Sequence, residues 1–142
     1  MEHAVQLAVA AGESEEVPVG AVIVRNGAII GRGRNRMQER ADPRAHAEML
    51  AIDDARETTG GSRLDGDTIY VTLEPCPLCA GAILLTRIGR VVFGAWDPRL
   101  GAAGSVFDLL GSAILGDVRV RPEVFEDRCS SLLSEWFRQE RR

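Results

Sequence analysis

Two short groups of metal-ligand residues, about thirty positions apart, constrain the fold of this chain more than any other feature. The first is His46-Ala47-Glu48, and the second is Pro75-Cys76-Pro77-Leu78-Cys79. One imidazole and two thiolates form a donor set that suits Zn²⁺, and the C-x-x-C spacing lets both sulfurs reach one ion from a single turn. A shared ion requires that the two segments meet in the folded chain.

Both groups lie where a loop enters an expected helix. Asp42-Pro43 precedes a helix from about Ala45 to Thr58, and the turn at 74–77 precedes a helix from about Leu78 to Arg87. The positive ends of both helices would therefore face the metal, which lowers the pKa of Cys76 and favours its thiolate.

The remaining chain alternates between helical and strand patterns. The expected elements are a helix over 2–11, a hairpin of 19–24 and 28–30 around Asn26-Gly27, strands over 67–73, 90–93 and 117–120, a short helix over 105–110 and a last helix over 123–138. Residues 31–42 are expected to form a strand end and then an exposed loop. This order predicts a three-layer α/β/α domain with one mixed sheet, in which strands 67–73 and 90–93 run parallel with a right-handed crossover.

Composition narrows the class of protein. At 142 residues the chain has the length of one domain, 1–142, and no apolar run reaches the roughly 20 residues of a membrane span. Met1 to Ala4 lack the basic stretch of a secretory signal. The odd number of cysteines argues against a disulfide framework and for thiol or metal chemistry. These features predict a single cytoplasmic domain with no membrane partner.

The basic residues, 17 in all, are without exception arginines, and the formal net charge is −4. An acidic chain argues weakly against a nucleic-acid partner unless its positive charge is local. Two arginine clusters offer such local charge: Arg32, Arg34, Arg36, Arg40 and Arg44 in the first, and Arg138, Arg141 and Arg142 in the second. Bidentate phosphate contacts are one interpretation, and a solvated surface with arginine usage set by genome composition is the other.

Three protein ligands would leave a fourth tetrahedral position for water, which is typical of a catalytic zinc. Zinc lowers the pKa of that water from about 15.7 to near 7, and Glu48 is placed to carry protons rather than to bind the metal. Three other interpretations stay open: a C-x-x-C redox pair, a histidine that merely begins a helix, and a structural zinc closed by Cys129 or His3. An apolar place on the last helix explains Cys129 more simply, and a solvated terminus explains His3.

The two groups together match the H-x-E…P-C-x-x-C signature of the zinc-dependent nucleobase deaminases. Within the cytidine/deoxycytidylate deaminase superfamily, the chain resembles the bacterial tRNA-specific adenosine deaminases. The stretches that carry this resemblance are Val17 to Val22, Asn35, Asp42-Pro43, Ala45 to Glu48, Thr72 to Cys76, Cys79 to Ala82, Arg87 to Ala95, Asp97 and Gly101 to Ser105.

The resemblance implies a single deaminase domain over 1–142 with a cytidine-deaminase-like fold and a five-stranded mixed sheet. It further implies a homodimer with its active site near the subunit interface, and one Zn²⁺ per subunit held by His46, Cys76 and Cys79. The expected partner is the anticodon stem-loop of a tRNA, an arginine tRNA above all. The expected enzyme is a hydrolase acting on an amidine C–N bond.

The implied reaction converts adenosine to inosine at the wobble position of the anticodon. A zinc-bound hydroxide attacks C6 of the everted adenine, while Glu48 carries a proton to N1 and then to the leaving ammonia. The resemblance places Asn35, Ala47, Asp97 and Val19 at the substrate. Trp96 departs from a basic residue found in a relative, although its indole can stack on a base.

Two further hypotheses stay open beside the tRNA deaminase. The zinc group alone fits a deaminase of free bases or nucleosides such as guanine or cytosine equally well. A non-catalytic module stabilised by zinc would instead need four protein ligands and would tolerate the loss of Glu48.

Overall fold

The computed structural model describes residues 1–111 and 118–140. The elements in chain order are α1 (Glu2–Glu13), β1 (Gly20–Arg25), β2 (Ala28–Arg34), α2 (Met37–Arg40), α3 (Ala47–Thr59), β3 (Thr68–Leu73), α4 (Pro77–Leu85), β4 (Arg90–Ala95), β5 (Arg119–Arg121) and α5 (Glu126–Glu140). No helix among the described residues is long and apolar enough to span a membrane.

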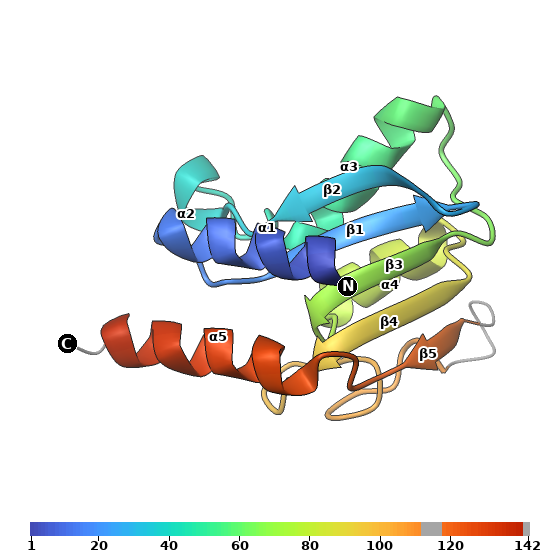
Figure 1. Cartoon of the computed structure of the whole chain (residues 1–142). Helices are drawn as coiled ribbons and strands as arrows, with labels where there is room; N and C mark the ends of the chain where they lie inside the picture. The colour runs from blue at the N-terminus through green and yellow to red at the C-terminus, as the bar shows by residue number, and fades with distance from the viewer. Residues whose placement is uncertain (112–117, 141–142) are drawn as a thin grey trace.

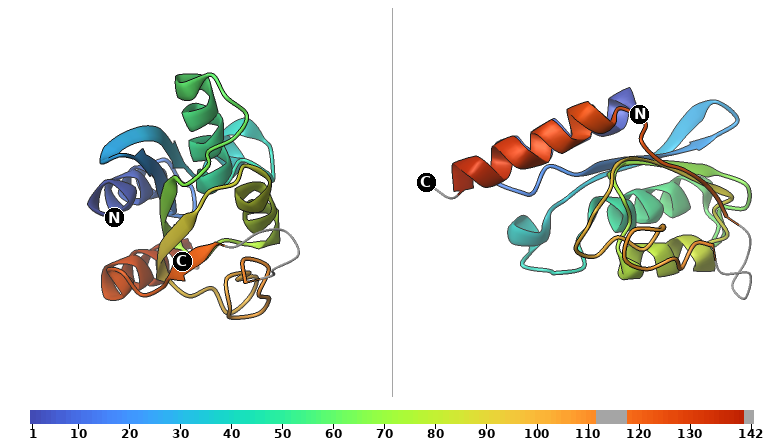
Figure 2. Two further views of the ribbon diagram at one scale, coloured as in Figure 1. Left: turned by 90° about the vertical axis from the view of Figure 1, so that its right-hand side faces the viewer. Right: turned by 90° about the horizontal axis from the view of Figure 1, so that it is seen from below.

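The five strands form one sheet in the order β2-β1-β3-β4-β5. β1 runs antiparallel to β2 and β3, whereas β3, β4 and β5 are parallel to one another, so the sheet is mixed. Helices α1 and α5 cover one face and α3 and α4 cover the other (Figures 1 and 2). The three-layer architecture, the five strands and the parallel pairing of β3 with β4 are therefore confirmed.

The hairpin between β1 and β2 turns at Asn26-Gly27, as the sequence predicts. Both residues have positive φ, +50° and +79°, which is the backbone conformation that an Asn-Gly turn favours. The prediction for 31–42 is partly wrong, because β2 continues to Arg34 and a short helix, α2, follows it. Gly31 and Gly33 explain the longer strand: a Cβ on either would collide with the backbone of α3, so only glycine lets β2 approach that helix.

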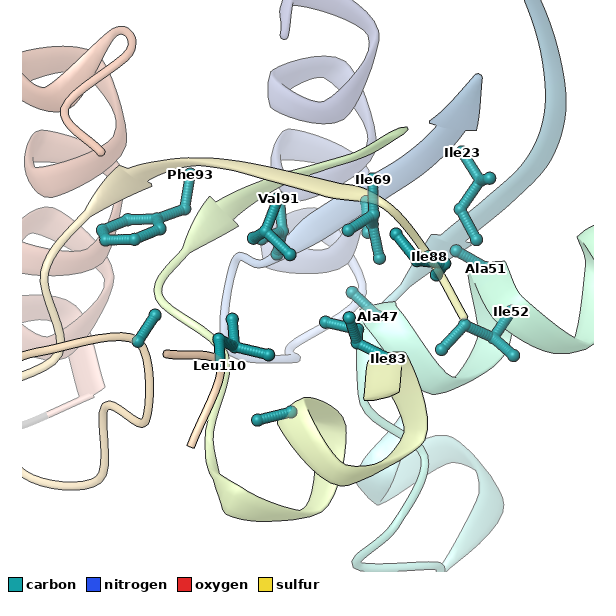
Figure 3. Packing of buried hydrophobic residues seen from close by; sticks show 14 of the residues in the cluster. Ile23, Ala47, Ala51, Ile52, Ile69, Ile83, Ile88, Val91, Phe93 and Leu110 are labelled. Atoms are coloured by element: carbon teal, nitrogen blue, oxygen red, sulfur yellow. The ribbon is translucent and has the colours of Figure 1, made fainter. Parts of the chain in front are cut away.

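The main core lies between the sheet and the α3–α4 layer. Figure 3 shows Ile69 and Val91 of the strands lying over Ile83 of α4 and Ala47 at the start of α3. Phe93 of β4 belongs to the same cluster. A smaller cluster of Val5, Ala95 and Cys129 packs under α1 and α5 on the opposite face of the sheet. The interpretation of Cys129 as an apolar residue of the last helix is thus confirmed, since it is buried there.

Two expected elements differ from the structure. Residues 105–110 form turns and a single bridge between Ala103 and Asp108 rather than a helix, because the preceding backbone is tied to Glu74. The last helix begins at Glu126 rather than Glu123, since the left-handed backbone of Glu123 and Phe125 cannot be helical. Of the strand expected over 117–120, Asp117 lies outside the described residues.

Candidate metal centre and its surroundings

The metal-ligand residues occupy the starts of α3 and α4. His46 is the N-cap residue of α3 and Cys76 is the N-cap residue of α4, and both have extended backbone. Their carbonyl oxygens accept the first helical bonds, from Leu50 and Ala80. Neither helix has a side-chain cap, because imidazole and thiol stand where Ser, Thr or Asp is usual. Pro77 at the first helical position of α4 needs no N–H partner and fixes the start of that helix.

The three predicted ligands come together at one point. Nδ1 of His46 lies 3.5 Å from Sγ of Cys76 and 3.5 Å from Sγ of Cys79. All three potential ligand atoms lie within 4.8 Å of one another, a spacing that a single tetrahedral ion can bridge. The two helix starts also direct their positive dipole ends at this point.

The donor set can be tested against the alternatives kept open above. Among the described residues, the group of potential ligands contains only His46, Cys76 and Cys79. Cys129 lies in the small cluster on the far face of the sheet, and His3 is exposed on α1. One nitrogen and two sulfurs match the preference of zinc and leave room for a fourth, non-protein ligand.

A hydrogen bond joins the two thiols and shifts their pKa values in opposite directions. The hydrogen bond from Cys79, followed by the contact with His46, lowers the pKa of Cys76 to about 4. The same bond to Cys76, together with burial, raises the pKa of Cys79. The bond with Cys76 also raises the pKa of His46. A divalent cation at this point would displace the thiol protons, because zinc binds the ionised sulfurs.

Glu48 lies in the first turn of α3 and is only 5% exposed. It contacts the thiol of Cys79 and feels the charges of Cys76 and His46. Burial raises the pKa of Glu48 to about 7. A buried carboxyl group that is next to the ligands, but is not one of them, can hold or release a proton beside a bound molecule.

Three of the expected substrate residues lie close to this centre in the fold. Ala47 is the first residue of α3, and Val19 precedes β1 in the main core. Asn35 is buried at the end of β2, where its N–H donates to the Val19 carbonyl oxygen at 3.0 Å. Its side-chain amide makes only long bonds, 3.4 Å to the Val17 carbonyl and 3.4 Å from the Met37 N–H, and so can exchange partners easily.

Asp97 and Trp96 follow β4. One carboxylate oxygen of Asp97 accepts bonds from the N–H groups of Arg99 and Leu100, at 3.0 and 3.3 Å, and so closes its own turn. The Trp96 indole packs edge-on against Phe93, with ring centroids 4.9 Å apart, and donates to Glu123. The indole is therefore held within the protein by an edge-to-face contact and a hydrogen bond.

The first arginine cluster forms a surface beside α3. Arg34 and Arg36 both pair with Glu39, and Arg44 pairs with Asp42 at 3.1 Å. Arg32, Arg34, Arg36 and Arg40 also line a groove of about 530 Å³ that includes acidic residues of α3. The N–H of Arg36 donates to the Ala45 carbonyl, which places Arg36 next to the metal-ligand histidine. In the second cluster, Arg141 and Arg142 lie outside the described residues.

Two buried carboxylates that were not singled out from the sequence, Glu74 and Glu16, hold the backbone of neighbouring segments. Glu74 and Glu16 are each 1% exposed. Glu16 accepts bonds from the N–H groups of Gln38 and Glu39, at 3.2 and 2.7 Å, and so fixes α2. Glu74 binds the backbone of the loop after β4. The only sequence signal was a glutamate directly before Pro75, which was interpreted as part of a turn.

Comparison with known proteins places this geometry in a family. Residues 1–95, which include both metal-ligand groups, match the model of the cytidine and deoxycytidylate deaminase zinc-binding region. The chain belongs to this family. Zinc is the metal of the family, and the donor set at 46, 76 and 79 agrees with it.

Individual relatives cover most of the chain. The tRNA-specific adenosine deaminase of Bacillus subtilis is 46% identical over all of this chain and 89% of its own length. A solved structure from a study of A-to-I editing by tRNA:A34 deaminases at the wobble position has a TM-score of 0.90 and 42% identity, covering 94% of this chain and 97% of that one. A guanine deaminase from Bacillus subtilis is 41% identical, with a TM-score of 0.66 over 75% of this chain and 68% of its own.

Proposed function

We propose that this protein deaminates the wobble adenosine of a tRNA anticodon to inosine, in the cytoplasm and with an arginine tRNA as the preferred substrate. The proposal is carried by one observation: an imidazole and two thiols converge at two helix starts, with a buried carboxyl group beside them. Similarity along the whole chain to a tRNA-specific adenosine deaminase favours tRNA over a free base. The guanine deaminase matches a smaller part of the chain.

In the proposed mechanism, His46, Cys76 and Cys79 hold the zinc. Zinc bound there lowers the pKa of a water molecule and so makes a nucleophile available at neutral pH. Glu48 takes a proton from the attacking water and gives it to N1 of the adenine. Glu48 then takes the remaining proton from the hydroxyl group formed at C6 and gives it to the amino group, so that the C6–N bond breaks and ammonia leaves. One water is consumed and one ammonia is released, so no other reactant is needed.

We assign the contacts with the everted nucleotide to Asn35, Ala47, Val19 and Asp97. The weak side-chain bonds of Asn35 support its role, since a nucleotide can replace them without leaving a strong bond broken. Ala47 and Val19 offer small apolar surfaces beside the centre. For Asp97, the support is its place in the loop that packs on the residues preceding Cys76.

We also propose that the enzyme is a homodimer. The support is the exposed apolar surface of α4, the helix that begins at Cys76: Leu85 is 79% exposed and Leu78 is 41% exposed. Sedimentation of the parent protein should give twice the chain mass of 15.4 kDa. Replacing Leu85 with glutamate should shift the species toward the monomer because it puts a charge in an apolar contact.

The deciding experiment uses an anticodon stem-loop with adenosine at the wobble position, read by inosine formation. A matched stem-loop with guanosine at that position serves as the control, and free adenosine and guanine are assayed in parallel. Inosine from the first stem-loop alone is the expected result. Ammonia from free guanine, with no inosine in the RNA, would replace the proposal with a base deaminase.

A further inference from the structure

Glu74 stands at the end of β3, two residues before Cys76, and its carboxylate binds the loop that follows β4. This segment, residues 97–105, is the 97–105 loop. One carboxylate oxygen accepts the N–H of Asp97 at 2.9 Å and the hydroxyl of Ser105 at 2.6 Å. The other accepts the N–H groups of Ala103 and Ser105 at 2.9 and 3.1 Å. Four donors from three residues thus converge on one carboxylate that is 1% exposed.

One further contact ties the same loop to the chain that carries Cys76: the N–H of Ala102 donates to the carbonyl oxygen of Pro75 at 2.8 Å. The backbone of Glu74 is held by β4 instead, because its N–H donates to the carbonyl oxygen of Ala95 at 2.8 Å. Gly101 leaves space for the carboxylate, because a Cβ there would collide with Glu74 and with the Ser105 hydroxyl. The loop and the metal-bearing turn are therefore built as one unit around Glu74.

Residues 98–100 of the 97–105 loop are exposed, and Ala102 of the same loop donates to Pro75, which directly precedes Cys76. We propose that Glu74 is a positioning residue for RNA: it fixes the 97–105 loop against the turn that carries Cys76 and thereby sets the affinity for the anticodon stem-loop. It does not touch the reacting atoms. This inference rests on the proposed tRNA substrate, and it predicts a change in KM with kcat unchanged.

A merely structural role must be distinguished, since the loss of any buried carboxylate weakens a fold. Asp67 provides a matched control, because it directly precedes β3 whereas Glu74 directly follows it. It is 3% exposed and holds the Arg25 guanidinium with two bonds of 2.9 and 2.8 Å. Loss of its charge should lower the melting temperature without reaching the 97–105 loop.

The experiment compares Glu74→Gln with Asp67→Asn on the zinc-loaded enzyme. An amide at 74 keeps the shape but points a donor at N–H groups, so about half of the loop bonds are lost. Glu74→Gln should raise KM for the stem-loop about tenfold, with kcat and zinc content unchanged, because the less firmly held loop binds the RNA more weakly. Asp67→Asn should leave KM unchanged. Equal KM changes in both variants, or a fall of kcat and zinc in Glu74→Gln, would overturn the proposal.

Ser105→Ala offers a milder test at an exposed position that folding tolerates. It removes the one side-chain donor to Glu74 and should raise KM about threefold. Adding it to Glu74→Gln should have almost no further effect, because residues that act through one hydrogen-bond network are not additive. Multiplied effects in the double variant would contradict a shared role.

Hydrogen exchange does not require catalytic activity, so it tests the positioning role of Glu74 independently of the proposed tRNA substrate. Hydrogen exchange should show lost protection at the N–H groups of Asp97, Ala103 and Ser105 in Glu74→Gln, with α4 unchanged. If the parent makes no inosine, the proposed function has failed. If the parent is active and the protection of the loop is unchanged in Glu74→Gln, the positioning role has failed instead.

Discussion

The metal-ligand group and the first arginine cluster are neighbours that are held in opposite ways. The ligands and Glu48 sit at the starts of two helices, where Cys79 and Glu48 are buried and His46 and Cys76 are partly buried. Arg34 and Arg36 instead share one partner, Glu39, at the surface and beside a helix of only four residues. Buried groups on helices keep one geometry, whereas exposed ion pairs are worth little and exchange readily with solvent ions.

This contrast separates chemistry from recognition. Changes at the centre should abolish turnover or metal binding, because no neighbouring group can take over. Changes in the arginine cluster should weaken binding of the proposed RNA substrate gradually, since each arginine would be one of several charges available to its phosphates.

The largest effect is expected from Cys76→Ala or Cys79→Ala. Zinc should fall from about one ion per chain to near zero, and activity should be lost with it, because two ligands do not hold the ion. Elemental analysis measures the zinc content, and the stem-loop assay measures the activity. Cys129→Ala is the control, since that thiol lies on the other face of the sheet. A full zinc content in the Cys76 variant would remove it from the ligand set.

Glu48→Gln should come next, with kcat lower by about 10²–10⁴-fold and zinc retained, because an amide cannot carry the proton. Glu57→Gln, at the other end of α3, should keep the parent kcat. Single-turnover rates and metal analysis of the two variants test whether the rate falls while the zinc is retained. Near-normal turnover by Glu48→Gln would show that the proton takes another route.

Removing two arginines together, Arg34→Ala with Arg36→Ala, should raise KM for the stem-loop about tenfold through lost phosphate contacts, with kcat unchanged. Arg63→Ala is the matched control, since Arg63 pairs with Asp65 at the surface on a separate loop. An unaltered KM in the double variant would assign these arginines to solvent and erase the contrast between the two regions.

The smallest effect is a dependence on salt. If about two phosphates are neutralised, KM should rise about sevenfold between roughly 50 and 200 mM salt. The double arginine variant should lose most of this slope, whereas Glu48→Gln should keep it for binding. A parent slope near zero would mean that recognition of the loop depends on stacking and shape rather than on charge.

Local signals were sufficient for the elements that hold the metal. Asp42-Pro43 before one helical pattern, and the turn at 74–77 before the other, indicate two helix starts, and the structure begins these helices directly after His46 and Cys76. The hairpin followed equally from Asn26-Gly27. These features depend on residues close together in the chain, which is why sequence alone predicts them.

The misses depend on distant partners instead. The helix expected over 105–110 does not form because the N–H groups of Ala103 and Ser105 donate to Glu74, some thirty residues earlier. α2 has only four residues, too few to show a periodicity, and its start is fixed by Glu16 from before β1. No local sequence pattern predicts that Glu74 is buried by the 97–105 loop, because the two come together only in the folded chain.

The missing side-chain caps of α3 and α4 have a consequence for the life of the protein in the cell. An ion bound by both N-cap residues would link the two helices of one layer. Zinc binding would therefore be part of folding rather than a step that follows it. During zinc starvation, the starts of α3 and α4 would not be held together in newly made chains, and proteases could cleave these chains more readily. Supply of the metal would set how much of this protein survives as well as how fast it works.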